Sequence, residues 1–160
     1  MLVLSLLAVT ALASEDVNDA VYQQLSQRHG TTCEALWELG EASAVRDGLL
    51  KVATEATMPP WAPLNAAGCL MERLGTDEET YGLVKGWMLD SDKAGLALVV
   101  VQNVDTLEEE KALELAKLAV ARAQLDPRFA LYAQPALQKS KFKAVVDLAP
   151  NMVVPTPSTP

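Results

Sequence analysis

Apolar residues recur every three or four positions along most of this 160-residue chain, and that spacing is the period of an α-helix. The clearest case runs from Leu107 to about Ala123, where alanines and leucines form one stripe and charged residues form the opposite face. The sequence has no Asn-Gly hairpin and no alternation of strand and helix patterns. We therefore expect an all-α fold of about nine short helices joined by loops of about two to six residues.

One segment admits two interpretations. Residues 94–101 read AGLALVVV, and the unbroken apolar run from Leu96 to Val101 is also typical of a buried strand. Both neighbouring segments have a helical pattern, however, and a lone strand would have no partner for its backbone hydrogen bonds. We predict a helix that is buried on most sides.

Polar residues mark the expected helix starts. Thr31, Thr76 and Thr106 each stand three positions before a glutamate, which is the capping-box pattern. Ser43 and Ser140 are expected to cap two further helices through their side-chain oxygens.

Prolines give two more predictions. Asp126 followed by Pro127 predicts a side-chain cap and then a proline in the first turn of a helix. Pro135 lies inside the apolar stripe of that helix, where we expect a kink or a break because proline lacks the backbone N–H.

The N-terminus has the pattern of an export signal. Residues 1–13 read MLVLSLLAVTALA, without a charged side chain, and this run is shorter than the about 20 residues that span a bilayer. Its Ala-Leu-Ala end predicts cleavage between Ala13 and Ser14, the alternative being a buried N-terminal helix. We expect a bacterial-type exported protein, periplasmic or extracellular, with no transmembrane segment after cleavage. Its helical domain would cover residues 14–149, and a Pro/Thr-rich, disordered tail would cover residues 150–160.

The charge balance narrows the class of partner. The chain has 13 Lys+Arg and 21 Asp+Glu, a net charge of −8, so we expect no nucleic-acid partner, because phosphates require a basic surface. The charge is −12 over residues 14–110 and +4 over residues 111–160. This polarity can steer a charged partner to one end, although solvated helix faces are the simpler explanation.

One basic cluster stands out in the second half of the chain. It consists of Arg128, Lys139, Lys141 and Lys143. We treat these residues as a candidate contact for an acidic partner, for membrane headgroups or for an anionic polysaccharide. A role in solubility alone fits the cluster equally well.

The two cysteines are the most informative reactive pair. Cys33 and Cys69 both lie on predicted inner helix faces, 36 positions apart. An exported chain enters an oxidising compartment, where an even number of cysteines favours a disulfide. We therefore predict a Cys33–Cys69 bond, the alternative being two separate buried thiols.

No constellation for catalysis emerges from the sequence. His29 is the only histidine; with Cys33 and Cys69 it would make an incomplete metal site, and no GxSxG elbow accompanies it. The carboxylate runs 77–79 and 108–110 fall in first turns of predicted helices, where negative charge complements the helix dipole. We expect no cofactor, no metal and no enzymatic activity.

Three segments give the chain a repetitive character. Helix starts at Pro63, near Asp92 and at Pro127 lie 29 and 35 residues apart, and each opens a pair of helices whose first member is small and apolar. Those first helices contain NAAGCL, GLALVV and FALYAQ. Over residues 31–149 the pattern resembles a HEAT-like (armadillo-type) α-helical repeat. The resemblance implies a short right-handed solenoid of antiparallel helix pairs, and an irregular helical bundle is the alternative.

That resemblance leads to an expected function. We expect a monomeric, non-enzymatic module that presents a surface to a protein partner, whose identity the sequence does not give. The alternatives are a small enzyme that uses carboxylates or His29 in a groove, and a carrier of small apolar ligands.

Overall fold

The computed structural model describes residues 14–27, 30–73 and 77–152. These residues form α-helices and short 3-10 helices, and they contain no strand, so the all-α prediction is confirmed for this part of the chain. The α-helices are α1 (Ser14–Ser26), α2 (Cys33–Trp37), α3 (Ala42–Glu55), α4 (Trp61–Met71), α5 (Glu78–Leu89), α6 (Ala94–Gln102), α7 (Glu109–Leu125), α8 (Pro127–Gln138) and α9 (Lys143–Val146). The 3-10 helices are η2 (Ser91–Lys93), η3 (Val104–Thr106) and η4 (Ala149–Asn151).

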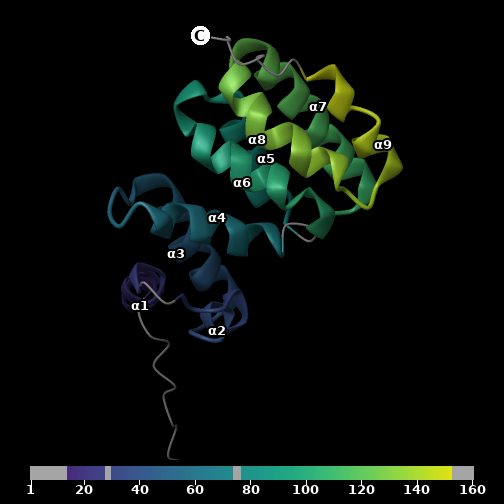
Figure 1. Cartoon of the computed structure of the whole chain (residues 1–160). Helices are drawn as coiled ribbons and strands as arrows, with labels where there is room; N and C mark the ends of the chain where they lie inside the picture. Colours follow the sequence, from purple (N-terminus) through teal and green to yellow (C-terminus); the bar gives the residue numbers. More distant parts are fainter. Residues whose placement is uncertain (1–13, 28–29, 74–76, 153–160) are drawn as a thin grey trace, which may run out of the picture.

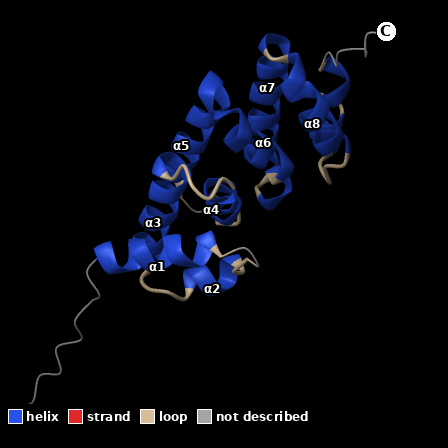
Figure 2. Cartoon of the chain, turned by 60° about the vertical axis from the view of Figure 1, so that its left-hand side comes forward, coloured by secondary structure: helices blue, strands red, loops and turns tan. Residues whose placement is uncertain are grey.

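The helices follow one another through space in nearly the order of the chain. Helices α1 to α4 lie at one end of the molecule and α5 to α9 at the other, as Figures 1 and 2 show. Helix α3 packs on α1 and α4, α6 joins α4 to α8, and α5 packs on α6 and α7. Each helix therefore contacts mainly helices that are close to it in sequence.

A single apolar core runs through this arrangement. It extends from Val17 in α1 to Met152 after η4 and consists mainly of alanine, valine and leucine. Small side chains let helices approach closely, and Ala66, Ala116 and Ala133 are completely buried between their neighbours. The low aromatic content of the chain thus agrees with the way its helices pack.

Residues 94–101 are helical, as predicted. They form most of α6, which packs on α4, α5, α7 and α8. Because α6 has neighbours on so many sides, nearly all of its surface is apolar, and its sequence therefore resembles that of a buried strand.

Several helix starts differ from the predicted capping residues. Helix α2 is capped by Thr32, whose hydroxyl accepts a hydrogen bond from the Ala35 amide, so the predicted cap at Thr31 is wrong by one residue. Helix α3 begins at Ala42 after Glu41, which makes no side-chain cap bond, so the predicted cap at Ser43 is also wrong. In α2 two neighbouring threonines can both cap, and Thr32 is the one that has the extended backbone of a cap residue, whereas α3 starts without a side-chain cap bond.

Two other predicted caps are used for contacts between helices. The Thr106 hydroxyl donates to the Met71 and Asn103 carbonyls, and α7 begins after Glu108 instead. The Ser140 hydroxyl donates to the Asp105 carboxylate, and α9 begins three residues later. These predictions are wrong because a hydroxyl binds whichever acceptor the fold brings near it.

The start of α5 is also different. The predicted cap Thr76 lies outside the described residues, and Asp77 caps the helix by accepting from the Thr80 amide. The predicted cap of α8 is confirmed, since Asp126 accepts from the backbone amides of Arg128 and Phe129.

Pro135 does not break α8, which continues to Gln138. The proline removes a hydrogen bond to the Leu131 carbonyl, and both residues lie on the exposed side of the helix. Water can therefore satisfy that carbonyl, so the helix tolerates the proline.

The packed part of the chain extends past the predicted boundary at residue 149. Helix η4 includes Pro150, and Met152 is buried. The Gln134 amide donates to the Ala149 and Met152 carbonyls and holds this segment on α8. The rest of the predicted tail lies outside the described residues, as does the predicted export signal over residues 1–13 with its cleavage site between Ala13 and Ser14.

Candidate functional site: an apolar groove between the ends of α5 and α7

Two leucines are far more exposed than a core-forming residue should be. Leu125 is 89% exposed and Leu89 is 72% exposed, the highest values among the large apolar side chains of the described residues. Both line one open cavity of about 360 Å³, which Met88 and Leu118 complete as its apolar walls. We call this cavity the Leu89–Leu125 groove. Exposed apolar surface gathered around one hollow is typical of a binding site.

The local sequence explains why these leucines face outward. Leu89 is the last residue of α5, because the backbone of Asp90 is extended, with a ψ angle of 116°. Leu125 is the last residue of α7, and Asp126 ends the helix because its side chain caps α8. The neighbouring Met88 is buried, so the core of this region is filled without either leucine.

Arg122 forms the polar base of the groove. It is only 7% exposed, and its guanidinium donates hydrogen bonds to backbone carbonyls at the end of α5 and the start of η2. These acceptors are the carbonyls of Trp87 at 3.2 Å, Met88 at 3.1 Å, Asp90 at 2.7 Å and Ser91 at 3.0 Å. A positive charge at a helix C-terminus is favourable, because the helix dipole is negative there.

Other atoms of Arg122 tie it to the next helix. Its Cζ atom lies 5.3 Å from the centre of the Phe129 ring in α8, whereas its Nε atom is buried without a hydrogen-bond partner. The residue was not among the sequence predictions. It follows Ala119 by three positions and precedes Ala123, so the period of the buried stripe places it at the edge of the inner face.

Two acidic residues lie at the groove, one in its wall and one next to Leu89 in the sequence. The Asp126 carboxylate lines the groove, and the exposed Asp90 carboxylate accepts from the Asp92 amide at the start of η2. The positive charge of Arg122 is directed at the four carbonyls. The groove therefore offers apolar walls next to carboxylates, which suits an apolar side chain with a basic neighbour.

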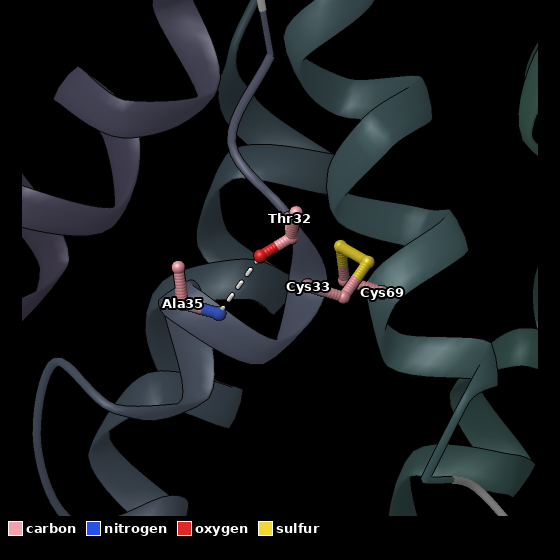
Figure 3. Close-up of a disulfide and its surroundings, with 4 residues drawn as sticks. All are labelled: Thr32, Cys33, Ala35 and Cys69. Atoms are coloured by element: carbon pink, nitrogen blue, oxygen red, sulfur yellow. Dashed lines mark hydrogen bonds between the residues drawn. A yellow bond between two sulfur atoms is a disulfide. The ribbon is translucent and has the colours of Figure 1, made fainter.

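The predicted cysteine pair lies at the other end of the molecule. The sulfur atoms of Cys33 and Cys69 are at bonding distance, and the Cα atoms are 5.1 Å apart (Figure 3). The bond joins α2 to α4, directly beside the Thr32 cap of α2. Helix α2 has only five residues, and this covalent link holds it to α4 in addition to the burial of Leu36 and Trp37.

The structure spreads the predicted basic cluster over several elements. Arg128 is near the start of α8 and Lys139 follows its end, about 16 Å further along the axis. The Lys141 ammonium donates to the Asp105 carbonyl at 2.6 Å, and Lys143 pairs with Asp147. These four residues do not form one continuous patch around a common point.

The carboxylate run 108–110 lies at the start of α7, where Glu108 makes no side-chain cap bond, whereas two residues of the run 77–79 have structural partners. Asp77 caps α5, and Glu78 pairs with Lys111 of α7. The described residues contain no group of three His, Cys, Asp or Glu side chains placed to hold a metal ion. His29 lies outside them. Among the same residues, no helix combines the length and the apolar character needed to cross a membrane.

Comparisons with known proteins do not assign the chain to a family. No protein-family model matches the chain, and neither the curated proteins nor the solved structures include one that is significantly similar to it.

Proposed function

We propose that this chain is an exported, non-enzymatic helical-repeat protein that binds a protein partner through the Leu89–Leu125 groove. The single observation that carries the proposal is that the two most exposed apolar side chains of the described residues line the same cavity. Water around these leucines would be released when a partner covers them, and that release favours association.

The chemistry of the groove indicates the kind of segment that fits it. An apolar side chain of the partner would enter between Leu89 and Leu125, and a lysine or arginine beside it would face Asp90 and Asp126. The net charge of −8 favours the approach of such a basic segment over that of an acidic one.

Two further parts of the proposal concern architecture and compartment. Packing between helices that are close in sequence supports a HEAT-like array, because each repeat in such an array contacts only its neighbours. The Cys33–Cys69 pair is compatible with an oxidising compartment and thus supports export.

The magnitude of the effect follows from the leucine surface. Complete burial of one leucine side chain contributes about 1.5–3 kcal/mol. Two such side chains together contribute at least about 3 kcal/mol. Replacing both leucines by serine should therefore weaken partner binding by at least about 100-fold, because each 1.4 kcal/mol is tenfold in affinity.

The test is affinity capture from the exported fraction with chemical cross-linking and quantitative mass spectrometry. Three baits are compared: the wild-type chain, the Leu89→Ser/Leu125→Ser variant, and a matched Leu83→Ser/Leu131→Ser variant that alters two other exposed leucines. We expect at least one protein to be retained by the wild type and the matched variant and to fall at least tenfold with the groove variant.

Two results would overturn the proposal. One is equal retention of every protein by all three baits, and the other is no retention above background by the wild type. Far-UV circular dichroism of each bait guards against unfolding, which is not expected since surface substitutions usually change stability by about 0.5 kcal/mol or less.

A further inference from the structure

Three helices form one layer of the molecule and are almost free of charge. Helices α4, α6 and α8 lie side by side, and α3, α5 and α7 pack behind them (Figures 1 and 2). The three helices contain 11, 9 and 12 residues, and only one of these residues, Arg128, is charged. Helix α7 alone has six charged residues among its 17. We call the side of this layer that faces away from α3, α5 and α7 the α4–α6–α8 face.

Exposed apolar and uncharged side chains continue from one helix of this face to the next. Between α4 and α6, a Cβ atom on the exposed Gly95 would lie only 3.3 Å from the Leu64 side chain, which is itself exposed. Between α6 and α8, Gln102 and Tyr132 line one open cavity of about 360 Å³. Trp61 in α4 is 39% exposed, and Tyr132 is 64% exposed. Exposed apolar surface that is shared by three neighbouring helices is typical of an interface.

The contacts within the layer show that α4 and α6 run in the same direction. Leu64 of α4 lies against Gly95 of α6, and four residues further along both helices Gly68 lies against Val99. The two pairs follow the same order in both helices, so α4 and α6 are parallel.

Helices α6 and α8 are parallel as well. Ser91 in η2, shortly before α6, and Asp126, directly before α8, line the same groove. At the other end, the Ser140 hydroxyl after α8 donates to the Asp105 carboxylate after α6. The starts of the two helices therefore lie together and so do their ends, and all three helices of the face have one direction.

Charges of opposite sign stand at the two edges of the face. Glu72 directly follows α4 and Lys139 directly follows α8, and both are exposed. Because α4 and α8 are parallel and lie on either side of α6, these two residues lie at one end of the face, on opposite edges. At the other end, the exposed Arg128 of α8 lies across the face from Trp61 of α4.

We propose that the α4–α6–α8 face binds a second copy of this chain, so that two copies form a symmetric dimer. A turn of 180° about an axis along α6 lays one face on the other, with α6 on α6 and α4 of each copy on α8 of the other. Glu72 of one copy then faces Lys139 of the other, and Arg128 faces the Trp61 ring, which suits an ion pair and a cation–π contact. Symmetry forms each contact twice.

The net charge of the chain favours this face for a second copy. Each copy has a net charge of −8, so contact through a surface that carries carboxylates opposes like charges. None of the residues of α4, α6 and α8 is acidic, so laying these helices of one copy on those of another brings no carboxylates together. The dimer differs from the monomer that the sequence led us to expect.

The size of the face sets the strength of the dimer. Helices of 9 to 12 residues are about 14–18 Å long, and three of them about 9 Å apart cover a face of about 430 Å². A standard stable interface buries about 800 Å² on each partner. We therefore expect a reversible dimer with a dissociation constant between about 1 µM and 1 mM.

The dimer is independent of the proposed function. No residue that lines the Leu89–Leu125 groove belongs to α4, α6 or α8, so both grooves stay open when the two faces meet. The Leu89→Ser/Leu125→Ser chain should therefore dimerise like the wild type, and the two proposals can fail separately.

The experiment is sedimentation equilibrium of the oxidised chain at concentrations from about 10 µM to about 1 mM. We expect the mean mass to rise with concentration from that of a monomer toward that of a dimer. Trp61→Ser/Tyr132→Ser should weaken dimerisation at least tenfold, because symmetry removes each lost contact twice. The matched control is Leu83→Ser, which alters an exposed leucine of α5 outside the face and should change the dissociation constant less than twofold.

A charge swap tests the arrangement of the two copies. Glu72→Lys and Lys139→Glu, each alone, place like charges opposite one another and should weaken dimerisation several-fold. The Glu72→Lys/Lys139→Glu chain restores opposite charges at both edges and should dimerise like the wild type. Far-UV circular dichroism of each variant checks that it is folded.

Three results would overturn the dimer. They are a chain that stays monomeric up to about 1 mM, dimerisation that Trp61→Ser/Tyr132→Ser leaves unchanged, and a charge swap that fails to restore association. If the wild-type chain stays monomeric and Trp61→Ser/Tyr132→Ser loses a protein that the wild type captures from the exported fraction, the face binds a different protein and the dimer is again excluded.

Discussion

The replacement of Arg122 by methionine tests how the end of α5 and the floor of the groove are built. Methionine fills a similar space with apolar atoms but cannot donate the four hydrogen bonds to the α5 and η2 carbonyls. The variant therefore removes the donors with little change in packing volume.

The loss of unfolding free energy in Arg122→Met depends on which of the four carbonyls water can reach. Asp90 and Ser91 are exposed, so water can replace the guanidinium there, whereas Trp87 and Met88 are buried. Each buried carbonyl left without a partner costs about 1–3 kcal/mol, and part of this is offset because a buried charge is removed. We expect Arg122→Met to lower the free energy of unfolding by about 3 kcal/mol.

Urea unfolding followed by far-UV circular dichroism measures this loss. With an m value of about 2 kcal/mol/M, the midpoint should fall by about 1.5 M. Arg128→Met, which removes an exposed arginine, should stay within about 0.5 kcal/mol of the wild type. If Arg122→Met costs less than about 1 kcal/mol, the carbonyl bonds do not hold the end of α5 in the way described.

Three further perturbations follow from the structure. Reduction of the disulfide should lower the free energy of unfolding by about 3–4 kcal/mol, since the bond closes a loop of 36 residues, and unchanged urea midpoints with and without reductant would contradict this. Gly48→Ala should destabilise by about 1–2 kcal/mol, because an added Cβ would lie 2.9 Å from the Asn18 side-chain oxygen. By contrast, the unobstructed helical Gly86→Ala should stabilise by about 0.5–1 kcal/mol, and thermal unfolding that ranks the two variants the other way would refute the packing argument. The hydrogen bond from Lys85 lowers the pKa of Glu114. The Glu114 carboxylate should therefore stabilise the fold above its unfolded-state pKa, and this stabilisation should be lost as the pH falls through the folded-state pKa. Glu114→Gln should flatten the acid limb of a plot of unfolding free energy against pH, and an unchanged limb would refute the assignment.

The elements of the fold could be predicted from the sequence because they depend on local periodicity. The stripe in α7 repeats every three or four residues, and the start of α8 depends on the adjacent residues Asp126 and Pro127. The cap residues were less predictable, since Thr31 and Thr32 have the same chemistry and only tertiary packing selects the second. The same limit explains Ser140, whose hydroxyl found an acceptor 35 positions away.

The candidate site could be predicted only in part. Leu89 and Leu125 both lie off the apolar stripe of their own helix, so the helical period already marks them as outward-facing residues. Leu89 and Leu125 line one groove because α5 packs against α7. That packing between helices cannot be read from the local sequence pattern of either one. Arg122 was missed because arginine is rarely buried, and its partners are backbone atoms, which leave no signal in the sequence.

The most direct test of the groove as a docking surface is photo-cross-linking from position 125. A benzoyl-phenylalanine residue placed there in the oxidised chain should capture a protein from the exported fraction, and the cross-linked peptide should contain an apolar residue beside lysine or arginine. The same probe at position 131, another exposed leucine, should not capture that protein. Identical adducts from both positions, or none from position 125, would contradict the account.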